Sequence, residues 1–245
     1  MCLAKVLIPM DPCRWWHPVD RLLSYMSDKL CNDIFLEFFR TGKFNWGMGR
    51  LISKPFSAEN KDAPTSLDYL GVNYYSNRVF QFHSDGLISL ICRKLHMPVP
   101  FNRQKAYSCG ALAGRNTTDK TDHAIYPEGL YRVLKRTAQA LPNIPLCVTE
   151  FGIADKNDTK RNLFYKQHMY AIYKAIRDGV KVKGAHIWTW MDTNGWTPET
   201  IDTNKQSRYG LYAVNFDTQE RTLREGAKDM VYLMHHNCYP KAISA

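Results

Sequence analysis

The stretch PLCVTEFG at residues 145–152 decides the fold of this chain. It is a short apolar run that ends on a carboxylate, Glu150. Apolar side chains then follow at helical spacing, which predicts a helix that is capped by Asp158 or Thr159 and ends at Gly179. The predicted buried face of this helix comprises Phe164, His168, Ala171, Ile172, Ala175 and Ile176. A strand followed by such a helix is the repeating unit of parallel α/β folds.

The same alternation of strand and helix extends over the whole chain. The predicted strands are residues 4–10, 67–75, 145–150, 184–191 and 211–216, and the predicted helices are residues 18–39, 127–140, 158–179 and 224–235. The last strand could pair as a hairpin with the strand before it, or belong to an irregular excursion before the last helix. About four strand–helix units result, half of those in a complete (β/α)8 barrel. The predicted fold is therefore half of a TIM barrel, with residues 1–245 as one partial barrel domain.

One connection is longer than the others. Residues 80–121 are rich in Ser, Asn, Gly and Pro, with a possible short helix near residues 87–95. Such a length is unusual for an ordinary connection and is typical of functional loops.

The composition excludes several classes of function. The hydrophobic content of 44% over 245 residues allows a sizeable core. The formal net charge is +10, but the basic residues are scattered among acidic ones, so nucleic-acid binding is not expected. No run of about 18 apolar residues and no signal peptide are recognisable, so no membrane association is expected. Seven cysteines without a CxxC pair favour reduced thiols and a cytoplasmic protein.

Polar and aromatic residues gather where the predicted parallel strands end, which is where α/β folds place their chemistry. Glu150 could be a reacting carboxylate, although a salt-bridged carboxylate at a barrel rim is the more common reading of such a residue. Asn73 and Tyr75 suit hydrogen bonding to a carboxylate and to a sugar hydroxyl, or simply form a polar strand end. Three tryptophans close to Asp192 could stack on sugar rings or belong to the core: Trp188, Trp190 and Trp196.

Five segments, in this order, resemble family 1 glycoside hydrolases, the family of β-glucosidases and 6-phospho-β-glucosidases. They are YLGVNYY at residues 69–75, DHAIYPEGL at 122–130, PLCVTEFG at 145–152, GAHIWTWMD at 184–192 and SRYGLY at 207–212. The third is similar to the family pattern P-x-x-I-T-E-N-G, and the first to F-x-G-x-N-Y-Y. The resemblance implies the C-terminal half of the family's TIM barrel, about strands 5 to 8.

The resemblance also implies a retaining double displacement in which Glu150 is the nucleophile. Tyr75 would orient Glu150, and the site for the non-reducing sugar would be lined by Asn73, Trp188 and Trp196. Neither a metal nor a cofactor is expected, because retaining glycosidases use carboxylates alone and His235-His236 lack a third ligand at a useful spacing.

Several family features are missing from this sequence. The acid/base glutamate of the family lies in an Asn-Glu-Pro motif, and the sequence contains no Asn-Glu dipeptide. Gly195 stands where a sugar-clamping glutamate is usual, and Phe151 stands where the family has Asn. Relatives that bind phosphorylated sugars have a serine and a lysine where this chain has Gly195 and Ser207, with Lys205 nearby, so the sugar stays open.

Two functional readings remain. In the first, the chain is an O-glycosyl hydrolase of β-glucosidase type that acts on a β-glycoside. This chain would be inactive alone, and a separate N-terminal half-barrel chain would supply the acid/base. In the second, it is a non-catalytic remnant with weak or no carbohydrate binding.

Overall fold

The computed structural model describes residues 1–47, 55–84, 91–92, 94–95, 107–110, 117–119, 123–193 and 208–238. Its centre is a four-stranded sheet in the order β1 (Cys2–Val6), β5 (Tyr69–Tyr74), β8 (Leu146–Phe151) and β9 (Val182–Ile187). All neighbouring pairs in this sheet are parallel. The strands follow one another in space as they do in the sequence, as in a barrel wall.

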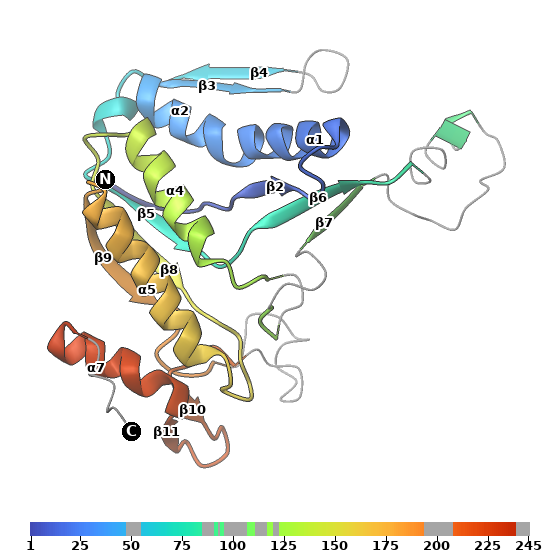
Figure 1. Cartoon of the computed structure of the whole chain (residues 1–245). Coiled ribbons are helices and arrows are strands. Elements are labelled where there is room, and N and C mark those ends of the chain that lie inside the picture. The colour runs from blue at the N-terminus through green and yellow to red at the C-terminus, as the bar shows by residue number, and fades with distance from the viewer. Residues whose placement is uncertain are drawn as a thin grey trace.

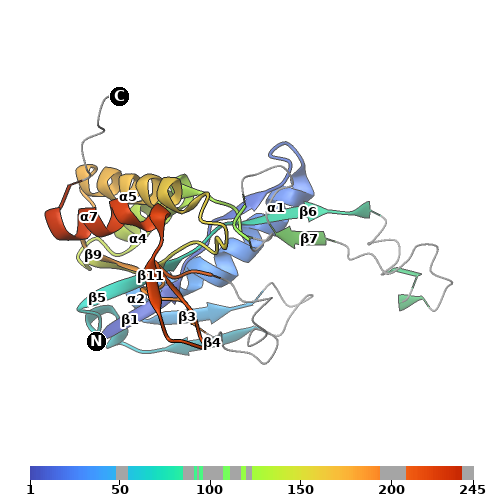
Figure 2. The ribbon, with the colours of Figure 1, turned by 90° about the horizontal axis from the view of Figure 1, so that it is seen from below.

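Each strand of the central sheet is followed by helical structure. A helical run of α1 (Pro18–Asp28), a π-helical turn (Lys29–Asp33) and α2 (Ile34–Thr41) comes after β1. The helices after β5, β8 and β9 are α4 (Pro127–Ala140), α5 (Arg161–Arg177) and α7 (Lys228–His236). Helices α4 and α5 lie side by side on one face of the sheet (Figures 1 and 2). Among the described residues, no helix has both the length and the apolar character needed to cross a bilayer.

The core lies between the central sheet and these helices. It buries alternate strand residues against the apolar faces of α4 and α5, including Leu70, Val72, Tyr74, Leu146, Val148, Phe151, Leu130, Leu134, Phe164 and Ile172. We call this side of the sheet the helix face and the opposite side the inner face.

Three smaller sheets extend from the strand ends and loops. The strands β2 (Met10–Pro12), β6 (Arg78–Phe82) and β7 (Tyr107–Gly110) form one, which projects away from the central sheet (Figure 1). The other two are antiparallel hairpins, β3 (Lys43–Trp46) with β4 (Phe56–Glu59) and β10 (Tyr212–Val214) with β11 (Arg221–Leu223). Short 3-10 turns occur at Ala63–Thr65 and Glu225–Ala227.

The predicted strands need three corrections. The expected strand at residues 4–10 is divided into β1 and β2, since Pro9 has no N–H with which to continue a ladder. The strand expected at residues 184–191 is β9, which ends at Ile187. The strand expected at residues 211–216 is β10, which forms a hairpin with β11. It meets the end of the strand expected at residues 184–191 in a parallel bridge between Met191 and Tyr212 and not as a hairpin, so the excursion before the last helix is the correct alternative.

The predicted helices also differ in detail. The helix expected at residues 18–39 contains the π-helical turn, and the last helix begins as a 3-10 turn. Helix α5 is not capped by Asp158 or Thr159. Its first backbone N–H groups, those of Lys160 and Arg161, donate to the Asp155 carboxylate at 2.7 and 2.9 Å. The side chain of Ile176, expected on the buried face, is 46% exposed. The possible helix near residues 87–95 lies mostly outside the described residues.

A buried histidine lies at the centre of the helix–sheet interface. The His168 ring is fully buried and stacks on Phe164, with 3.9 Å between ring centroids. Its Nδ1 contacts the Phe164 carbonyl oxygen at 2.8 Å, and its Nε2 has no hydrogen-bond partner. Burial lowers the pKa of His168 to about 4, so the ring is neutral in the folded protein at neutral pH.

This histidine makes stability depend on pH. The unfolded chain binds a proton at His168 near pH 6.5, whereas the folded chain does so only near pH 4. Above about pH 6.5, His168 is neutral in both states and does not lower the free energy of unfolding. As the pH falls from 6.5 towards 4, only the unfolded chain gains the proton, and the free energy of unfolding falls by about 3 kcal/mol in total. We predict that His168→Leu flattens the free energy of unfolding against pH in this window, measured by urea denaturation.

The matched control is His236→Leu. His236 makes the same kind of contacts, a ring nitrogen 3.0 Å from the Tyr232 carbonyl oxygen and a stacked ring, but it is exposed. An equal effect of both substitutions on the pH dependence would contradict the assignment to His168.

Candidate active site

A bulge in β8 places Glu150 on the inner face of the sheet. Val72 pairs with Val148, but the next residue of β5, Asn73, pairs with Glu150, so β8 contains one extra residue at this point. The same shift appears against β9, where the three residues that follow Val148, up to Phe151, match only the two residues that follow Ala185, up to Ile187. Phe151 consequently returns to the helix face, where it packs against α5. Bulges of this kind redirect side chains next to active sites.

Glu150 is held by a tyrosine at the end of the neighbouring strand. The Tyr75 hydroxyl donates to Glu150 Oε2 over 2.6 Å, and both side chains are half-buried. On the same face, Thr149 Oγ1 donates to Asn73 Oδ1, also over 2.6 Å. The structure thus brings together Asn73, Tyr75 and Glu150, although Tyr75 and Glu150 lie 75 residues apart in the sequence. It adds Thr149, which belongs to the motif at residues 145–152 but whose contact with Asn73 was not predicted.

The electrostatics of the pair favour one proton arrangement. Burial raises the pKa of Tyr75 above its ordinary value, and the hydrogen bond to Glu150 raises it further. The phenol therefore keeps its proton and remains the donor, while the carboxylate accepts. Such a charge-assisted hydrogen bond orients one carboxylate oxygen of Glu150.

Two rings enclose Tyr75. Tyr209 meets it edge to face, with 6.1 Å between ring centroids, and His123 lies tilted against it at 6.3 Å. Tyr209 belongs to the motif at residues 207–212, but its contact with Tyr75 was not predicted. No sequence spacing relates two residues that belong to separate loops.

Trp188 reaches the site through its backbone. Its N–H donates to the Phe151 carbonyl oxygen at 2.9 Å, and a cis peptide bond joins it to Thr189. Its carbonyl oxygen would lie 1.8 Å from a Cβ added at Gly152, so the backbones that follow β8 and β9 approach too closely here to admit a side chain at residue 152. Trp196, with Gly195 and Ser207, lies outside the described residues.

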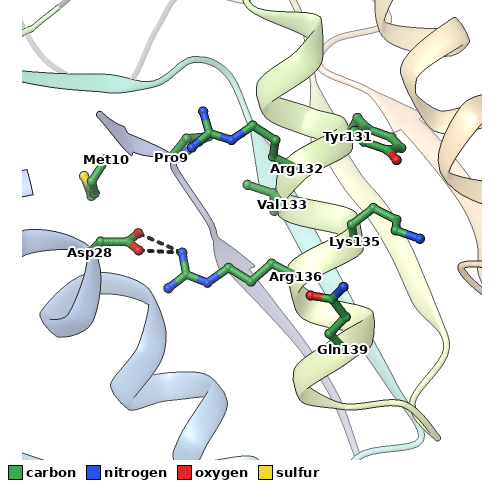
Figure 3. A pocket seen from close by; sticks show the side chains of 9 residues that line it. All are labelled: Pro9, Met10, Asp28, Tyr131, Arg132, Val133, Lys135, Arg136 and Gln139. Atoms are coloured by element: carbon green, nitrogen blue, oxygen red, sulfur yellow. Dashed lines mark hydrogen bonds and ion pairs between the residues drawn. The ribbon is translucent and has the colours of Figure 1, made fainter. Parts of the chain in front are cut away.

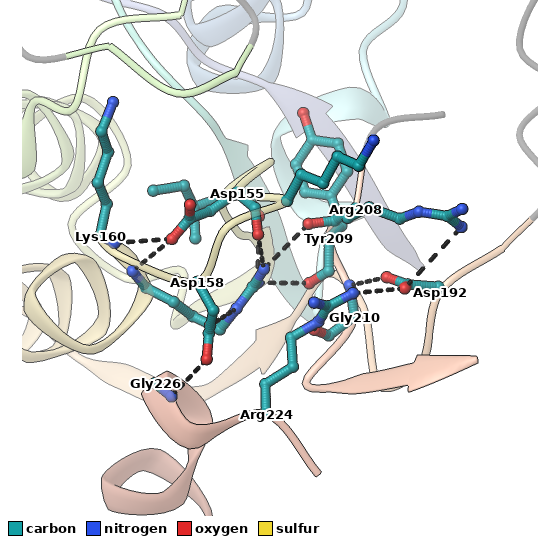
Figure 4. A network of polar contacts seen from close by, with 12 residues as sticks. Asp155, Asp158, Lys160, Asp192, Arg208, Tyr209, Gly210, Arg224 and Gly226 are labelled. Atoms are coloured by element: carbon teal, nitrogen blue, oxygen red, sulfur yellow. Dashed lines mark hydrogen bonds and ion pairs between the residues drawn. The ribbon is translucent and has the colours of Figure 1, made fainter. Parts of the chain in front are cut away.

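The remaining members of the tryptophan segment have structural partners. Trp190 is 47% exposed and packs on Tyr212, with 5.4 Å between the rings. Asp192 is buried and accepts from Arg224 Nη2 at 2.6 Å and from the Gly210 N–H at 2.9 Å (Figure 4). Its carboxylate is therefore held in this loop contact.

A cavity of about 340 Å³ lies elsewhere, between α4, β2 and α1 (Figure 3). Both of its arginines are paired with carboxylates: Arg132 pairs with Asp11 at 3.0 Å, and Arg136 pairs with Asp28 and Asp33. Its lysine, Lys135, donates to the Asp178 carbonyl oxygen at 3.1 Å. The two arginine pairs fasten α4 to β2 and to the first helical segment, so both arginines serve structural contacts. Within the part of the chain that the structure describes, no three His, Cys, Asp or Glu side chains are grouped as metal ligands.

Comparison with known proteins agrees with this geometry. The model of glycosyl hydrolase family 1 matches residues 17–237. The chain belongs to glycosyl hydrolase family 1. It is 27% identical to the 6-phospho-beta-glucosidase GmuD of Bacillus subtilis (strain 168) over 254 residues, which cover 94% of this chain and 51% of that protein.

Solved structures show the same partial overlap. A beta-glycosidase from Pyrococcus horikoshii matches with a TM-score of 0.70 and 26% identity, over 94% of this chain and 47% of that one. A beta-glucosidase from Exiguobacterium marinum matches in fold, with a TM-score of 0.72 and 19% identity, over 98% of this chain and 52% of that one. This family 1 chain spans about half the length of the relatives it matches. The predicted fold, the C-terminal half of a (β/α)8 barrel, is confirmed.

The contact at Gly152 generates a prediction. An alanine there would force the Trp188 carbonyl away from β8, because the added Cβ would lie 1.8 Å from its oxygen. We expect Gly152→Ala to lower the free energy of unfolding, measured by urea denaturation, by about 1–3 kcal/mol. Gly184→Ala is the control, since the nearest atom to its added Cβ is Cys147 Sγ at 3.6 Å. Equal stability of the two variants would show that the Gly152 contact is not tight.

Proposed function

We propose that this family 1 chain is the nucleophile-bearing half of a retaining β-glycosidase of β-glucosidase type. The observation that carries the proposal is the hydrogen bond from Tyr75 to Glu150 on the inner face of the sheet, at the carboxyl ends of β5 and β8. A carboxylate held in this way at the end of a barrel strand suits attack on a sugar bound above the sheet.

The chemistry assigned to the site is a double displacement. Glu150 attacks the anomeric carbon, the glycosidic C–O bond breaks, and an ester between the sugar and the enzyme forms. Tyr75 keeps one carboxylate oxygen occupied, so the other is the attacking atom. We propose that Asn73, Trp188 and Trp196 bind the non-reducing sugar. The leaving oxygen needs a proton, and water must then be activated, so a second carboxylate is required.

We propose that the second carboxylate comes from a separate half-barrel outside these 245 residues, because the sequence has no Asn-Glu dipeptide. The sheet supports this assignment, since β1 and β9 are edge strands among the described residues. The inner face beside β1 is also open, with Val6 44% and Tyr69 40% exposed. Open parallel edges and apolar inner faces invite pairing with further strands.

The class of substrate follows from the relatives. Curated relatives are named as 6-phospho-beta-glucosidases and 6-phospho-beta-galactosidases, and the solved structures as beta-glycosidases and beta-glucosidases. We propose a β-glycoside of a hexose, with the free sugar and its 6-phosphate as the two candidates. A non-catalytic remnant with weak or no carbohydrate binding is the competing hypothesis, and Gly195 at the position of the usual sugar-clamping glutamate favours it.

An activated glycoside separates these readings. We predict that the purified chain does not turn over p-nitrophenyl β-glucoside, because the leaving group still needs a proton donor. It should nevertheless be labelled at Glu150 by 2,4-dinitrophenyl 2-deoxy-2-fluoro-β-glucoside or its 6-phosphate, whose leaving group needs no acid and whose ester hydrolyses slowly. Mass spectrometry of the peptide that contains Glu150 measures the label.

Two variants control this experiment. Glu150→Gln should take no label, and Tyr75→Phe should take it at least about tenfold more slowly, because the carboxylate loses its orienting hydrogen bond. A folded chain that takes no label from either reagent would support the non-catalytic remnant. Labelling that persists in Glu150→Gln would assign the nucleophile to another residue.

The partner half generates its own prediction. We expect co-expression with a fragment that carries the first four strand–helix units of a family 1 relative to give a complex on size-exclusion chromatography and turnover of p-nitrophenyl β-glycosides. Turnover should disappear in Glu150→Gln while the complex remains. A fragment that neither binds the chain nor restores turnover would contradict the proposed partner.

A further inference from the structure

A fully buried arginine at the start of α5 binds the loops behind the site. The Arg161 side chain has no exposed surface, and all five of its N–H donors are used. Nε donates to Asp158 Oδ1 at 2.7 Å. The other four donors reach backbone carbonyls, those of Ile153, Asp155, Arg208 and Tyr209.

These acceptors belong to two separate loops. Ile153 and Asp155 lie in the connection from β8 to α5, directly after Glu150, at 3.3 and 2.7 Å from the guanidinium nitrogens. Arg208 and Tyr209 lie about 50 residues later in the chain, at 3.0 and 3.1 Å (Figure 4). One planar group therefore sets the distance between the loop after Glu150 and the segment that carries Tyr209.

The Tyr209 segment leads directly to the nucleophile's hydrogen bond. The Tyr209 ring meets the Tyr75 ring edge to face at 6.1 Å. The same ring lies 3.5 Å from a Cβ added at Gly152, two residues after Glu150. Tyr75 then donates to Glu150 at 2.6 Å. The chain of contacts from Arg161 to Glu150 passes through two aromatic rings, and each of its members is buried or half-buried.

We propose that Arg161 is a positioning residue for the nucleophile. Arg161 holds the carbonyls of Arg208 and Tyr209 and thereby fixes the Tyr209 ring against Tyr75. The Tyr209 ring in turn sets the direction in which Tyr75 donates to Glu150. The proposal rests on the function proposed above, in which Glu150 attacks the sugar. The proposal extends that function to Arg161, a residue at the start of α5 that does not itself contact the substrate.

The chemistry of arginine explains why this position needs it. A lysine has three donors on one nitrogen and cannot reach the carbonyls of both loops in the plane that the guanidinium spans. Arg161→Lys keeps the charge next to Asp158 but releases the Arg208 and Tyr209 carbonyls. The substitution therefore separates the effect of charge from the effect of loop position.

The first test measures reaction with 2,4-dinitrophenyl 2-deoxy-2-fluoro-β-glucoside. We expect Arg161→Lys and Tyr209→Leu each to lower the limiting rate constant of labelling at Glu150 at least about tenfold, with little change in the reagent concentration for half-maximal rate. The double variant should be no slower than the slower single variant, because both act through the same ring. Additive effects, or a wild-type rate in Tyr209→Leu, would overturn the proposal.

Arg136→Lys is the matched control. Arg136 also donates to two carboxylates, those of Asp28 and Asp33, but it fastens α4 to the first helical segment, away from Tyr209. This variant should be labelled at the wild-type rate. Slowing by Arg136→Lys equal to that by Arg161→Lys would mean that general stability, not position, sets the rate.

A second readout does not depend on activity. In chain that contains 3-fluorotyrosine, the 19F resonance of Tyr75 is assigned by its absence in Tyr75→Phe. We expect this resonance to shift in Arg161→Lys and in Tyr209→Leu, and to stay in place in Arg136→Lys. If no chain is labelled but the resonance shifts, the proposed function fails and the positioning contact stands. An unchanged Tyr75 resonance in Arg161→Lys would overturn the role of Arg161. If Arg161→Lys does not fold, an unchanged resonance in Tyr209→Leu would overturn it.

Discussion

The extra residue in β8 is the constraint on which the site depends. In a regular strand, Val148 and Glu150 would share a face, and Glu150 would enter the core between the sheet and α5. The bulge keeps Thr149 and Glu150 together on the inner face and returns Phe151 to the helix face, where it packs against Phe164 and His168. Burying the Phe151 ring stabilises the bulge, so core packing and carboxylate placement support one another.

Loops at the carboxyl ends of the strands are held by charged side chains that bind backbone. Arg161 and Asp155 satisfy carbonyls and N–H groups around the start of α5, and Asp192 with Arg224 does the same around Gly210. Buried backbone polar groups need such partners because irregular segments lack the ladders of strands and helices. The result is a rigid support behind Tyr75 and Glu150, built from residues that carry out no chemistry.

Much of this arrangement could be predicted from the sequence. Strand and helix periodicity located the four central units, and the rule that parallel strands carry their chemistry at the carboxyl ends selected Asn73, Tyr75 and Glu150. The resemblance also suggested that Tyr75 orients Glu150, but several other contacts between residues far apart were missed. Asp192 lies in the tryptophan segment proposed to bind sugar, but its partner is Arg224, 32 residues later. Ile176 fits the apolar period of α5, but 46% of its surface remains exposed.

The sequence by itself determined the fold class, the order of the strand–helix units and the residues at the strand ends, because these follow from local periodicity and from motifs within a few positions. Only the tertiary structure decided which of those residues face one another. The direction of Glu150 depends on the register of β8 against two other strands, and the position of Tyr209 depends on Arg161. Register and loop packing are set by burial and hydrogen bonding between distant segments, which no local pattern encodes.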